Sequence, residues 1–246
     1  MWRFITRLGK KLQLFYLLTA IFAVTAYDAF KVIITMKLRR KKELFYKHAR
    51  NWGEKLLSIC RVNVEVIGTE NILPGSAYIY VSNHSSLFDI PVLLAMIPDN
   101  IRIMYKRELE KIPFLGWALI SSPFISINRS DPRDAMAGLE EAIKSVREDV
   151  SVVIFPEGTR SKDGTLGVFK RGAFVLASRS GKKIIPVSIV GTNKILPTKS
   201  FDFTHGHVKM IIGKPLSITQ PIDRSEEKAL INSVRSTIEQ GMIMSD

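Results

Sequence analysis

Residues 152–160 of this chain read VVIFPEGTR, a short apolar run that ends in a turn carrying a carboxylate and an arginine. Residues 78–89 read YIYVSNHSSLFD, and here an apolar run leads directly to His84, with Asp89 five residues later. Such runs of Val, Ile and Tyr, bounded by Gly, Pro, Asn or Ser, are typical of β-strands. Ligands of open α/β sheets bind beyond the carboxyl ends of the strands. The two stretches therefore predict one site at one sheet edge.

Strand-like and helix-like runs alternate on both sides of these stretches. The clearest helix begins at Asp131-Pro132, an N-cap residue followed by proline at the first helical position. Further helices are predicted after Lys170 and over 225–242. Alternation of strands and helices predicts an α/β domain over residues 61–246, with a largely parallel or mixed sheet flanked by helices. The predicted strands lie at 62–67, 78–81, 101–105, 124–127, 152–155, 184–190 and 208–212.

The N-terminal arm carries most of the formal net charge of +13. Residues 1–42 hold ten basic side chains and one acid, Asp28, which leaves a net of +9 in the arm and +4 in the rest of the chain. Between Lys11 and Lys31 the residues are mainly apolar, but Gln13 and Asp28 interrupt them. A helix that spans a membrane needs about twenty largely apolar residues. The arm is therefore borderline for spanning.

A basic arm suits an anionic membrane or a nucleic acid, and the apolar content of this one favours the membrane. A second helical pattern covers 44–59, so residues 1–60 predict a two-helix hairpin, monotopic or peripheral, on the cytoplasmic face of the cell membrane. Its cations would lie against anionic phospholipids. A transmembrane helix with Lys37–Lys42 on the cytoplasmic side ranks second. A signal peptide with a small-residue site at Val24–Ala26 ranks third.

The sequence gives little support for a cysteine or a serine nucleophile. Cys60 is the only cysteine, so the chain forms no intramolecular disulfide. Its place on a helical apolar face predicts packing rather than catalysis. The G-x-S-x-G pattern of serine hydrolases does not occur. A serine hydrolase and a cysteine nucleophile are therefore disfavoured.

His84 and Asp89 admit two interpretations. A neutral imidazole can take a proton from a hydroxyl, and a carboxylate on its other nitrogen fixes the tautomer. Alternatively, Ser86 and Asp89 stand three residues apart and could be a helix N-cap and its partner. The interpretations are compatible, because a helix that starts at Ser86 would hold Asp89 in its first turn, near His84.

The segment Phe155–Arg160 is also open to two interpretations. Proline and glycine can mark an ordinary turn after a strand. An arginine beside a glycine turn can also hold an anion, because guanidinium binds phosphate through two parallel hydrogen bonds. Further cations that could assist are Lys106, Arg107, Arg129, Lys170 and Arg171.

Four stretches resemble, in order, the signature blocks of the glycerolipid acyltransferases. Asn83-His84 with Asp89 is similar to the first block, Phe155–Arg160 to the third and Ile185–Thr192 to the fourth. Residues 106–129 are similar to the more variable second block. The N-terminal arm resembles the membrane-associating helices of bacterial members, and the similarity is greatest to those that acylate 1-acyl-sn-glycerol 3-phosphate.

The resemblance implies transfer of a fatty acyl group from acyl carrier protein or acyl-CoA to the 2-hydroxyl of 1-acyl-sn-glycerol 3-phosphate, giving phosphatidic acid. It implies that His84 is the general base and that Asp89 orients it. No metal or organic cofactor is expected, and no nucleic acid partner. The residues that it assigns to the glycerol phosphate are Glu157, Gly158, Thr159, Arg160, Lys106 and Arg129.

Other activities stay open at this point. The same chemistry could act on glycerol 3-phosphate or on another lysophospholipid. In an acyl thioesterase, water would replace the lipid hydroxyl. A non-catalytic protein of the membrane surface is a third class, but it would give His84, Asp89, Glu157 and Arg160 no purpose.

Overall fold

The computed structural model describes residues 2–39, 42–128, 130–198, 200, 202–218 and 223–244, with side chains from residue 11 onward apart from those of residues 38, 39 and 42. Seven strands in the described ranges form one mixed sheet in the order β1-β7-β6-β2-β5-β3-β4. Only β6 and β7 run antiparallel among the described strand pairs. The strands are β1 (Val62–Ile67), β2 (Ile79–Ser82), β3 (Ile101–Lys106), β4 (Ile125–Ile127), β5 (Ser151–Ile154), β6 (Ile184–Val190) and β7 (Gly206–Ile212).

The structure confirms the predicted α/β class with a mixed sheet, and the predicted strands match the observed ones to within two residues at each end. The predicted cap of α5 is also present, since the Asp131 side chain accepts a hydrogen bond from the Arg133 N–H. Helices other than α5 (Pro132–Arg147) are α1 (Trp2–Ile34), α2 (Lys42–Ile59), α3 (Asp89–Met96), α4 (Leu115–Ser121), α6 (Gly172–Ser180), α7 (Thr192–Ile195) and α8 (Arg224–Ile243), with a π-helical turn at Thr35–Arg39 and 3₁₀ turns η2 (Thr69–Asn71) and η3 (Arg107–Lys111).

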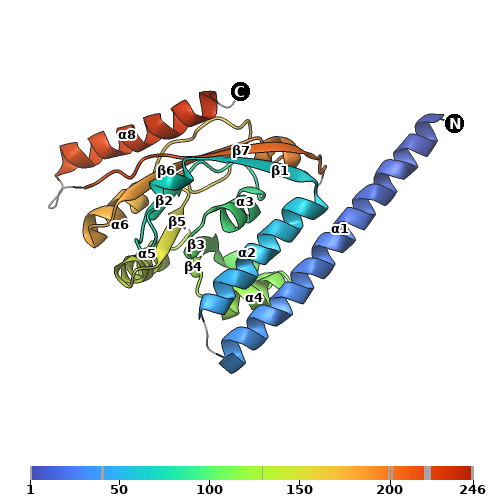
Figure 1. Ribbon diagram of the computed structural model, residues 1–246, viewed down its shortest axis with the longest axis horizontal. Helices are drawn as coiled ribbons and strands as arrows, with labels where there is room; N and C mark the ends of the chain where they lie inside the picture. Colours follow the sequence, from blue (N-terminus) through green and yellow to red (C-terminus); the bar gives the residue numbers. More distant parts are fainter. Residues whose placement is uncertain are drawn as a thin grey trace.

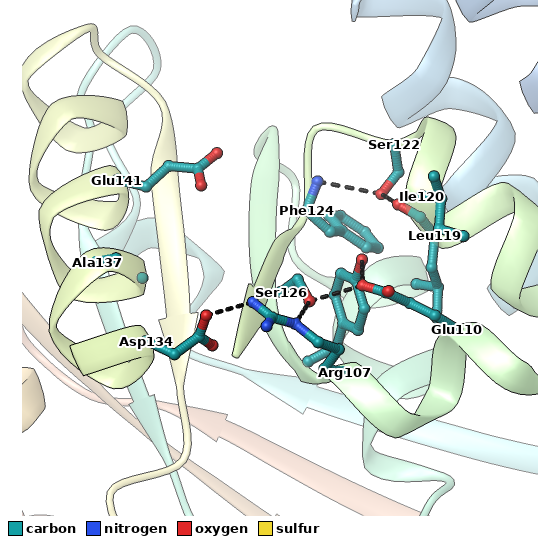
Figure 2. A pocket seen from close by; sticks show the side chains of 12 residues that line it. Arg107, Glu110, Leu119, Ile120, Ser122, Phe124, Ser126, Asp134, Ala137 and Glu141 are labelled. Atoms are coloured by element: carbon teal, nitrogen blue, oxygen red, sulfur yellow. Dashed lines mark hydrogen bonds and ion pairs between the residues drawn. The ribbon is translucent and has the colours of Figure 1, made fainter. Parts of the chain in front are cut away.

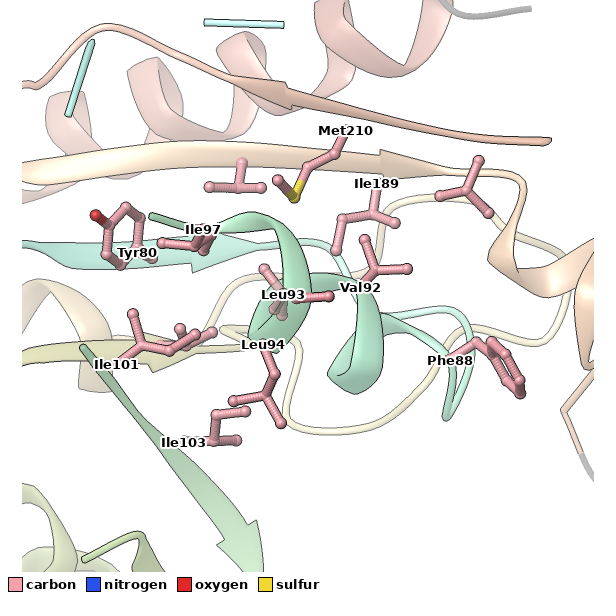
Figure 3. Packing of buried hydrophobic residues seen from close by; sticks show 14 of the residues in the cluster. Tyr80, Phe88, Val92, Leu93, Leu94, Ile97, Ile101, Ile103, Ile189 and Met210 are labelled. Atoms are coloured by element: carbon pink, nitrogen blue, oxygen red, sulfur yellow. The ribbon is translucent and has the colours of Figure 1, made fainter. Parts of the chain in front are cut away.

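Successive side chains of each strand point to opposite faces of the sheet, so the core has two layers. In β2, Ile79 belongs to one buried cluster and Tyr80 to the other, because successive strand residues point to opposite faces. Helices α5, α6 and α8 cover the face of Ile79, and α2 and α3 cover the face of Tyr80 (Figure 1). Figure 3 shows Leu93 of α3 among Tyr80, Ile189 and Met210 on the second face. Helix α3 is thus held firmly against the sheet.

Helices α2 and α3 approach each other closely at one glycine. A Cβ on Gly53 would lie 2.7 Å from the Pro91 carbonyl oxygen and 3.3 Å from the Ala95 nitrogen. Real Cβ atoms do not tolerate the first distance, so a larger residue would push the two helices apart. The absence of a side chain at position 53 therefore sets the spacing of α2 from α3.

Polar contacts attach the second half of α1 to α2. Asp28 is only 3% exposed and pairs with Lys55 at 2.8 Å, and Trp52 Nε1 donates to Thr25 at 3.1 Å. The acid that interrupts the apolar run therefore faces α2. The first half of α1 extends beyond α2 (Figure 1). Residues Lys11–Lys37 are long and apolar enough to cross a membrane by length and composition, and only 17% of the most apolar window is buried.

Cys60 follows α2 and is buried, as the sequence predicts. Burial raises the pKa of its thiol to about 11. With that pKa, only about one thiol in a thousand carries the reactive thiolate at pH 8. We expect native protein to resist a disulfide reagent such as dithiobisnitrobenzoate at pH 8, whereas protein unfolded in guanidinium releases one equivalent of chromophore. Rapid stoichiometric labelling of the native protein would contradict the burial.

Candidate active site

The two predicted motifs meet at the carboxyl edge of the sheet. Strands β2 and β5 are parallel neighbours with Val81 opposite Ile154, so the segments that follow them lie side by side. The His84 N–H donates to Glu157 Oε1 at 2.8 Å, and the Ser161 N–H donates to the His84 carbonyl oxygen at 2.8 Å. The prediction of a shared edge is confirmed, and hydrogen bonds join the two motifs directly.

His84 and Asp89 form a hydrogen-bonded pair. His84 Nδ1 lies 2.7 Å from Asp89 Oδ2, and the same oxygen accepts the N–H groups of Ser85 at 2.9 Å and Ser86 at 3.0 Å. The other oxygen, Oδ1, accepts the Thr192 hydroxyl at 2.5 Å. A carboxylate that accepts from every side requires Nδ1 to carry its proton, which leaves Nε2 with the lone pair. The pair therefore presents Nε2 as a proton acceptor.

The carboxylate of this pair is completely buried, and its surroundings explain how it is tolerated. Asp89 has no exposed surface, and an isolated charge there would be very costly. Four hydrogen-bond donors replace the water that Asp89 loses. Such satisfied networks hold their members in one geometry. Asp89 is thus suited to hold the imidazole of His84 and to stabilise its protonated form.

Helix α3 begins at Asp89 and not at Ser86, but both hydrogen bonds of the cap interpretation are present: Ser86 Oγ accepts the Phe88 N–H at 3.1 Å, and Asp89 Oδ2 accepts the Ser86 N–H. The Ser86 hydroxyl also donates to the Leu196 carbonyl oxygen at 2.8 Å. The Asp89 side chain binds the backbone of the loop before the helix. The segment between His84 and Asp89 is therefore a loop wrapped around the carboxylate.

Two residues that support this pair lie outside the His84–Asp89 segment. The His84 ring stacks on Phe155, with centroids 4.0 Å apart and planes 20° apart. Thr192 reaches Asp89 because Gly191, at φ 98°, turns the chain after β6 in a conformation that favours glycine. A Cβ at Gly191 would also lie 2.5 Å from the His207 carbonyl oxygen. Both Phe155 and Thr192 stand inside the recognised blocks, but spacing alone gives them no role.

Asn83 attaches the loop that carries His84 to β6. Its side-chain nitrogen donates to the Ile189 carbonyl oxygen and its side-chain oxygen accepts the Ile189 N–H, both at 2.8 Å. The amide thus continues the pairing of β2 with β6 for one further residue. His84 follows from this fixed point.

Glu157 connects the loop after β2 with a distant part of its own segment, which runs from β5 to α6. Oε1 accepts from the His84 N–H and Oε2 accepts from the Gly167 N–H, each at 2.8 Å. Burial raises the pKa of Glu157 above its ordinary value, while the two N–H donors favour the ionised form. Gly158 adopts φ 74°, and a Cβ there would lie 2.8 Å from Lys170 Nζ. The turn therefore brings a lysine over the glycine.

A cavity of about 510 Å³ opens beside this turn. Four of the predicted candidate residues line it, Glu157, Thr159, Arg160 and Lys170, and the structure adds the cation Lys162. The full lining is Glu157, Thr159, Arg160, Ser161, Lys162, Asp163, Thr165, Gly167, Val168 and Lys170. Cations on several sides of one hollow suit a phosphate group.

The remaining predicted cations lie elsewhere. Lys106, at the end of β3, pairs with Glu108 at 2.9 Å and does not line this cavity. Arg129 lies outside the described residues. Arg107 contacts Asp134, and Arg171 donates from its Nη2 to Glu227 Oε2 at 3.0 Å.

A second cavity, of about 350 Å³, lies beyond the ends of β3 and β4 (Figure 2). Its polar groups bind one another, since Arg107 donates to Ser126 at 3.4 Å and Glu110 accepts from Tyr105 at 3.0 Å and Ser126 at 2.6 Å. Of the described candidate cations Arg107 alone lines it, and its guanidinium is already paired with Asp134 and Ser126. The chemistry of the two motifs therefore belongs to the first cavity.

The geometry suits abstraction of a proton from a hydroxyl in a molecule that also carries an anionic group. Nε2 of His84 can receive the proton. The cavity of Arg160 is joined to His84 through Glu157 and Ser161, and it can hold the anion. In the described part of the chain, no three His, Cys, Asp or Glu side chains are arranged to hold a metal ion.

Comparisons with known proteins agree with this geometry. A family model described as Acyltransferase matches residues 63–190. A protein of Borreliella burgdorferi named 1-acyl-sn-glycerol-3-phosphate acyltransferase is 33% identical over 182 residues, which are 74% of this chain and 72% of that protein. A chloroplastic protein of Arabidopsis thaliana with the same enzyme name is 37% identical over 86% of this chain and 57% of its own length.

A solved structure also resembles this chain. The crystal structure titled as the 1-acyl-sn-glycerophosphate acyltransferase PlsC of Thermotoga maritima superposes with a TM-score of 0.81 at 28% identity, covering 96% of this chain and 95% of that one. The chain spans 57%, 44% and 49% of the first plant and algal relatives that it matches. The family match includes β1 to β6 and both motifs of the site. The chain belongs to the acyltransferase family.

Proposed function

We propose that the protein transfers a fatty acyl group from an acyl thioester, acyl carrier protein or acyl-CoA, to the 2-hydroxyl of 1-acyl-sn-glycerol 3-phosphate, giving phosphatidic acid. The observation that carries the proposal is the His84–Asp89 pair next to a cavity lined by Arg160, Lys162 and Lys170. The names of the bacterial relatives that match most of their own length support the choice of substrate.

The proposed reaction begins when His84 Nε2 takes the proton of the 2-hydroxyl. The oxygen attacks the thioester carbonyl carbon, and the tetrahedral intermediate collapses with loss of the thiolate. A thiol has an ordinary pKa of about 8.5, so it leaves readily and can recover the proton from the His84 imidazolium. Asp89 stabilises that imidazolium through Nδ1. The acyl group passes directly between the substrates, without an intermediate on serine or cysteine.

In this proposal the glycerol phosphate occupies the cavity beside Phe155–Arg160. Arg160 and Thr159 contact the phosphate, and Glu157 holds the wall of the cavity to the backbone of His84. Gly158 lets the turn take its positive φ. Lys106 and Arg129 remain supporting cations in this proposal. Lys106 would leave its ion pair with Glu108 and contact the ligand instead. The reaction needs no metal or organic cofactor, because a thioester is already an activated acyl group.

Membrane association through α1 and α2 accounts for how a lipid acceptor arrives. The exposed side chains of α1 include Phe15 at 71% and Tyr16 at 73%. Basic residues near such a surface each contribute about 1 kcal/mol of attraction to anionic phospholipids. We propose that the helix pair lies on the cytoplasmic face of the cell membrane, where acyl carrier protein and acyl-CoA are available.

The decisive experiment presents purified full-length protein with acyl-CoA or acyl carrier protein and a panel of acceptors. We expect thiol release and phosphatidic acid with 1-acyl-sn-glycerol 3-phosphate. Equal thiol release without an acceptor would instead indicate a thioesterase. Preference for glycerol 3-phosphate, or for a lysolipid with another head group, would indicate a sibling activity.

Replacing Arg160 with Ala is expected to raise the acceptor KM about 10- to 100-fold, because a hydrogen bond to a charged group is worth about 1.5–3 kcal/mol. The KM for the acyl thioester and kcat should change little. Initial rates with each substrate varied in turn give these values. Arg133→Ala on α5 is the matched control and should leave all three unchanged. An unaltered acceptor KM in Arg160→Ala would remove Arg160 from the phosphate site.

A further inference from the structure

Helix α4 presents apolar side chains to solvent. Of its seven residues only Gly116 is buried, whereas Trp117 is 53% exposed and Ile120 is 61% exposed. Residues three apart lie on the same side of a helix, so these two form one face. Ile112, just before the helix, is 44% exposed. We refer to Ile112, Trp117 and Ile120 as the α4 face.

The orientation of the α4 face is set by close contacts on its other sides. A Cβ on Gly116 would lie only 2.1 Å from the Glu110 carbonyl oxygen, so α4 rests directly on η3. Phe114, at φ 63°, packs edge-to-face against Phe22 of α1 with centroids 5.3 Å apart, and against Trp117 at 5.0 Å. A non-glycine residue rarely adopts this φ, and such strain persists only where the surroundings hold it. The face is therefore turned outward by a fixed arrangement.

The α4 face continues the apolar surface of α1. Phe22 is 56% exposed and its contact with Phe114 joins the two surfaces. Lys111 is exposed at the rim. Trp117 Nε1 makes no hydrogen bond to any described residue, unlike Trp52 Nε1. An exposed indole on an apolar surface is typical of a side chain at the boundary between water and lipid.

We propose that the α4 face is a second lipid-contacting surface, which enters the headgroup region of the same leaflet as α1. This inference rests on the membrane association proposed above. Helix α4 follows η3, which begins directly beyond the carboxyl end of β3, on the sheet edge that carries His84. Contact through the α4 face would therefore draw the active-site edge toward the lipid, from which the acceptor comes. Helix α1 alone could leave that edge turned away.

The test compares two doubly charged variants of the full chain. Trp117→Asp with Ile120→Asp alters the α4 face, and Ile243→Asp with Met244→Asp alters an even more exposed apolar pair at the end of α8, at 71% and 79% exposure. Partition onto 100 nm vesicles of phosphatidylglycerol and phosphatidylcholine is measured by co-sedimentation. Circular dichroism and thermal unfolding establish that each variant is folded. Acyl transfer to a short-chain lysophosphatidic acid, without vesicles, provides a separate readout of the active site.

We expect the α4 variant to partition at least about tenfold more weakly than wild type, and the α8 variant to match wild type within twofold. An environment-sensitive fluorophore on Trp117→Cys, with Cys60→Ala, should brighten and shift to the blue on vesicles. The same label on Ile243→Cys should not respond. Partition of the α4 variant within twofold of wild type would overturn the proposal, as would equal loss in the α8 variant. A wild-type dimer lost only in the α4 variant would assign the face to a second copy.

The outcomes separate this proposal from those on which it rests. If wild type binds vesicles and the α4 variant binds equally, only the role of the α4 face fails. If wild type does not bind vesicles, membrane association fails and the α4 proposal fails with it. If no variant transfers acyl groups but partition differs as expected, the proposed activity fails while the α4 surface stands.

Discussion

Replacing His84 with Ala is expected to lower kcat for acyl transfer by about 1,000-fold or more while the protein stays folded. The expected loss follows from the position of Nε2, which is the proton acceptor that the Asp89 pair leaves available. General-base assistance contributes about 100- to 10,000-fold in enzymes. Folding should survive, because Asp89 keeps three donors: the N–H groups of Ser85 and Ser86 and the hydroxyl of Thr192.

The measurement is thiol release with acyl-CoA and the lysolipid acceptor, followed with a disulfide reagent. Buried Cys60 should not contribute to that signal. His205→Ala replaces an exposed histidine and is the matched control, with wild-type activity expected. Retention of more than about a tenth of wild-type kcat by folded His84→Ala protein would exclude His84 as the base, since even modest base catalysis exceeds that factor.

Replacing Asp89 with Asn is expected to lower kcat about 100- to 10,000-fold with little change in either KM. The amide can keep the geometry, because its oxygen can occupy the place of Oδ2 while its NH₂ donates to the Thr192 hydroxyl. What it loses is the charge that stabilises the imidazolium and holds the proton on Nδ1. Steady-state kinetics with both substrates varied would separate the fall in kcat from any change in binding.

Thr192 provides the control for this interpretation. Thr192→Ser keeps a hydroxyl toward Asp89 Oδ1 and should retain most activity, whereas Thr192→Val removes a donor from a buried carboxylate and should lose more. Equal activity in Asp89→Asn and wild type would show that the carboxylate charge has no part in catalysis. A collapse in thermal stability of Asp89→Asn, with normal kcat in the folded fraction, would assign Asp89 to folding alone.

The sheet could be predicted closely because its strands are short runs of Val and Ile bounded by turn residues. Ile184–Val190 and Val62–Ile67 match their predicted bounds. The common edge of His84 and Arg160 also followed from sequence, since both motifs come directly after predicted strands. Neighbouring parallel strands then bring the motifs together.

Contacts between residues far apart in the chain could not be predicted in this way. Thr192 reaches Asp89 across 103 residues, and the Ser86 hydroxyl reaches the Leu196 carbonyl oxygen across 110. The second contact gives Ser86 a distant partner in addition to its local cap hydrogen bonds, and the cap rule considers local partners alone. Lys106 likewise looked free in the sequence, but Glu108 lies within reach once η3 forms.

The N-terminal arm also contains a distant contact that could not be predicted from the local sequence. Asp28 weakens the apolar run when the run is considered alone. In the folded chain its carboxylate is paired with Lys55, 27 residues later, and is hidden from the surface that faces outward. A charge inside an amphipathic helix therefore cannot be assessed without knowing which helix packs against it.

The close approach at Gly53 has a consequence for which hydroxyl can react. Because α2 touches α3 there without an intervening side chain, and α3 begins with Asp89, α2 packs directly on the helix whose first residue binds His84. Once α1 and α2 rest at a given level in the lipid, the height of Nε2 above that level is fixed. A hydroxyl would then react only if its depth in the leaflet matches the height of Nε2. The bilayer would thereby help to determine which hydroxyl of the acceptor is acylated.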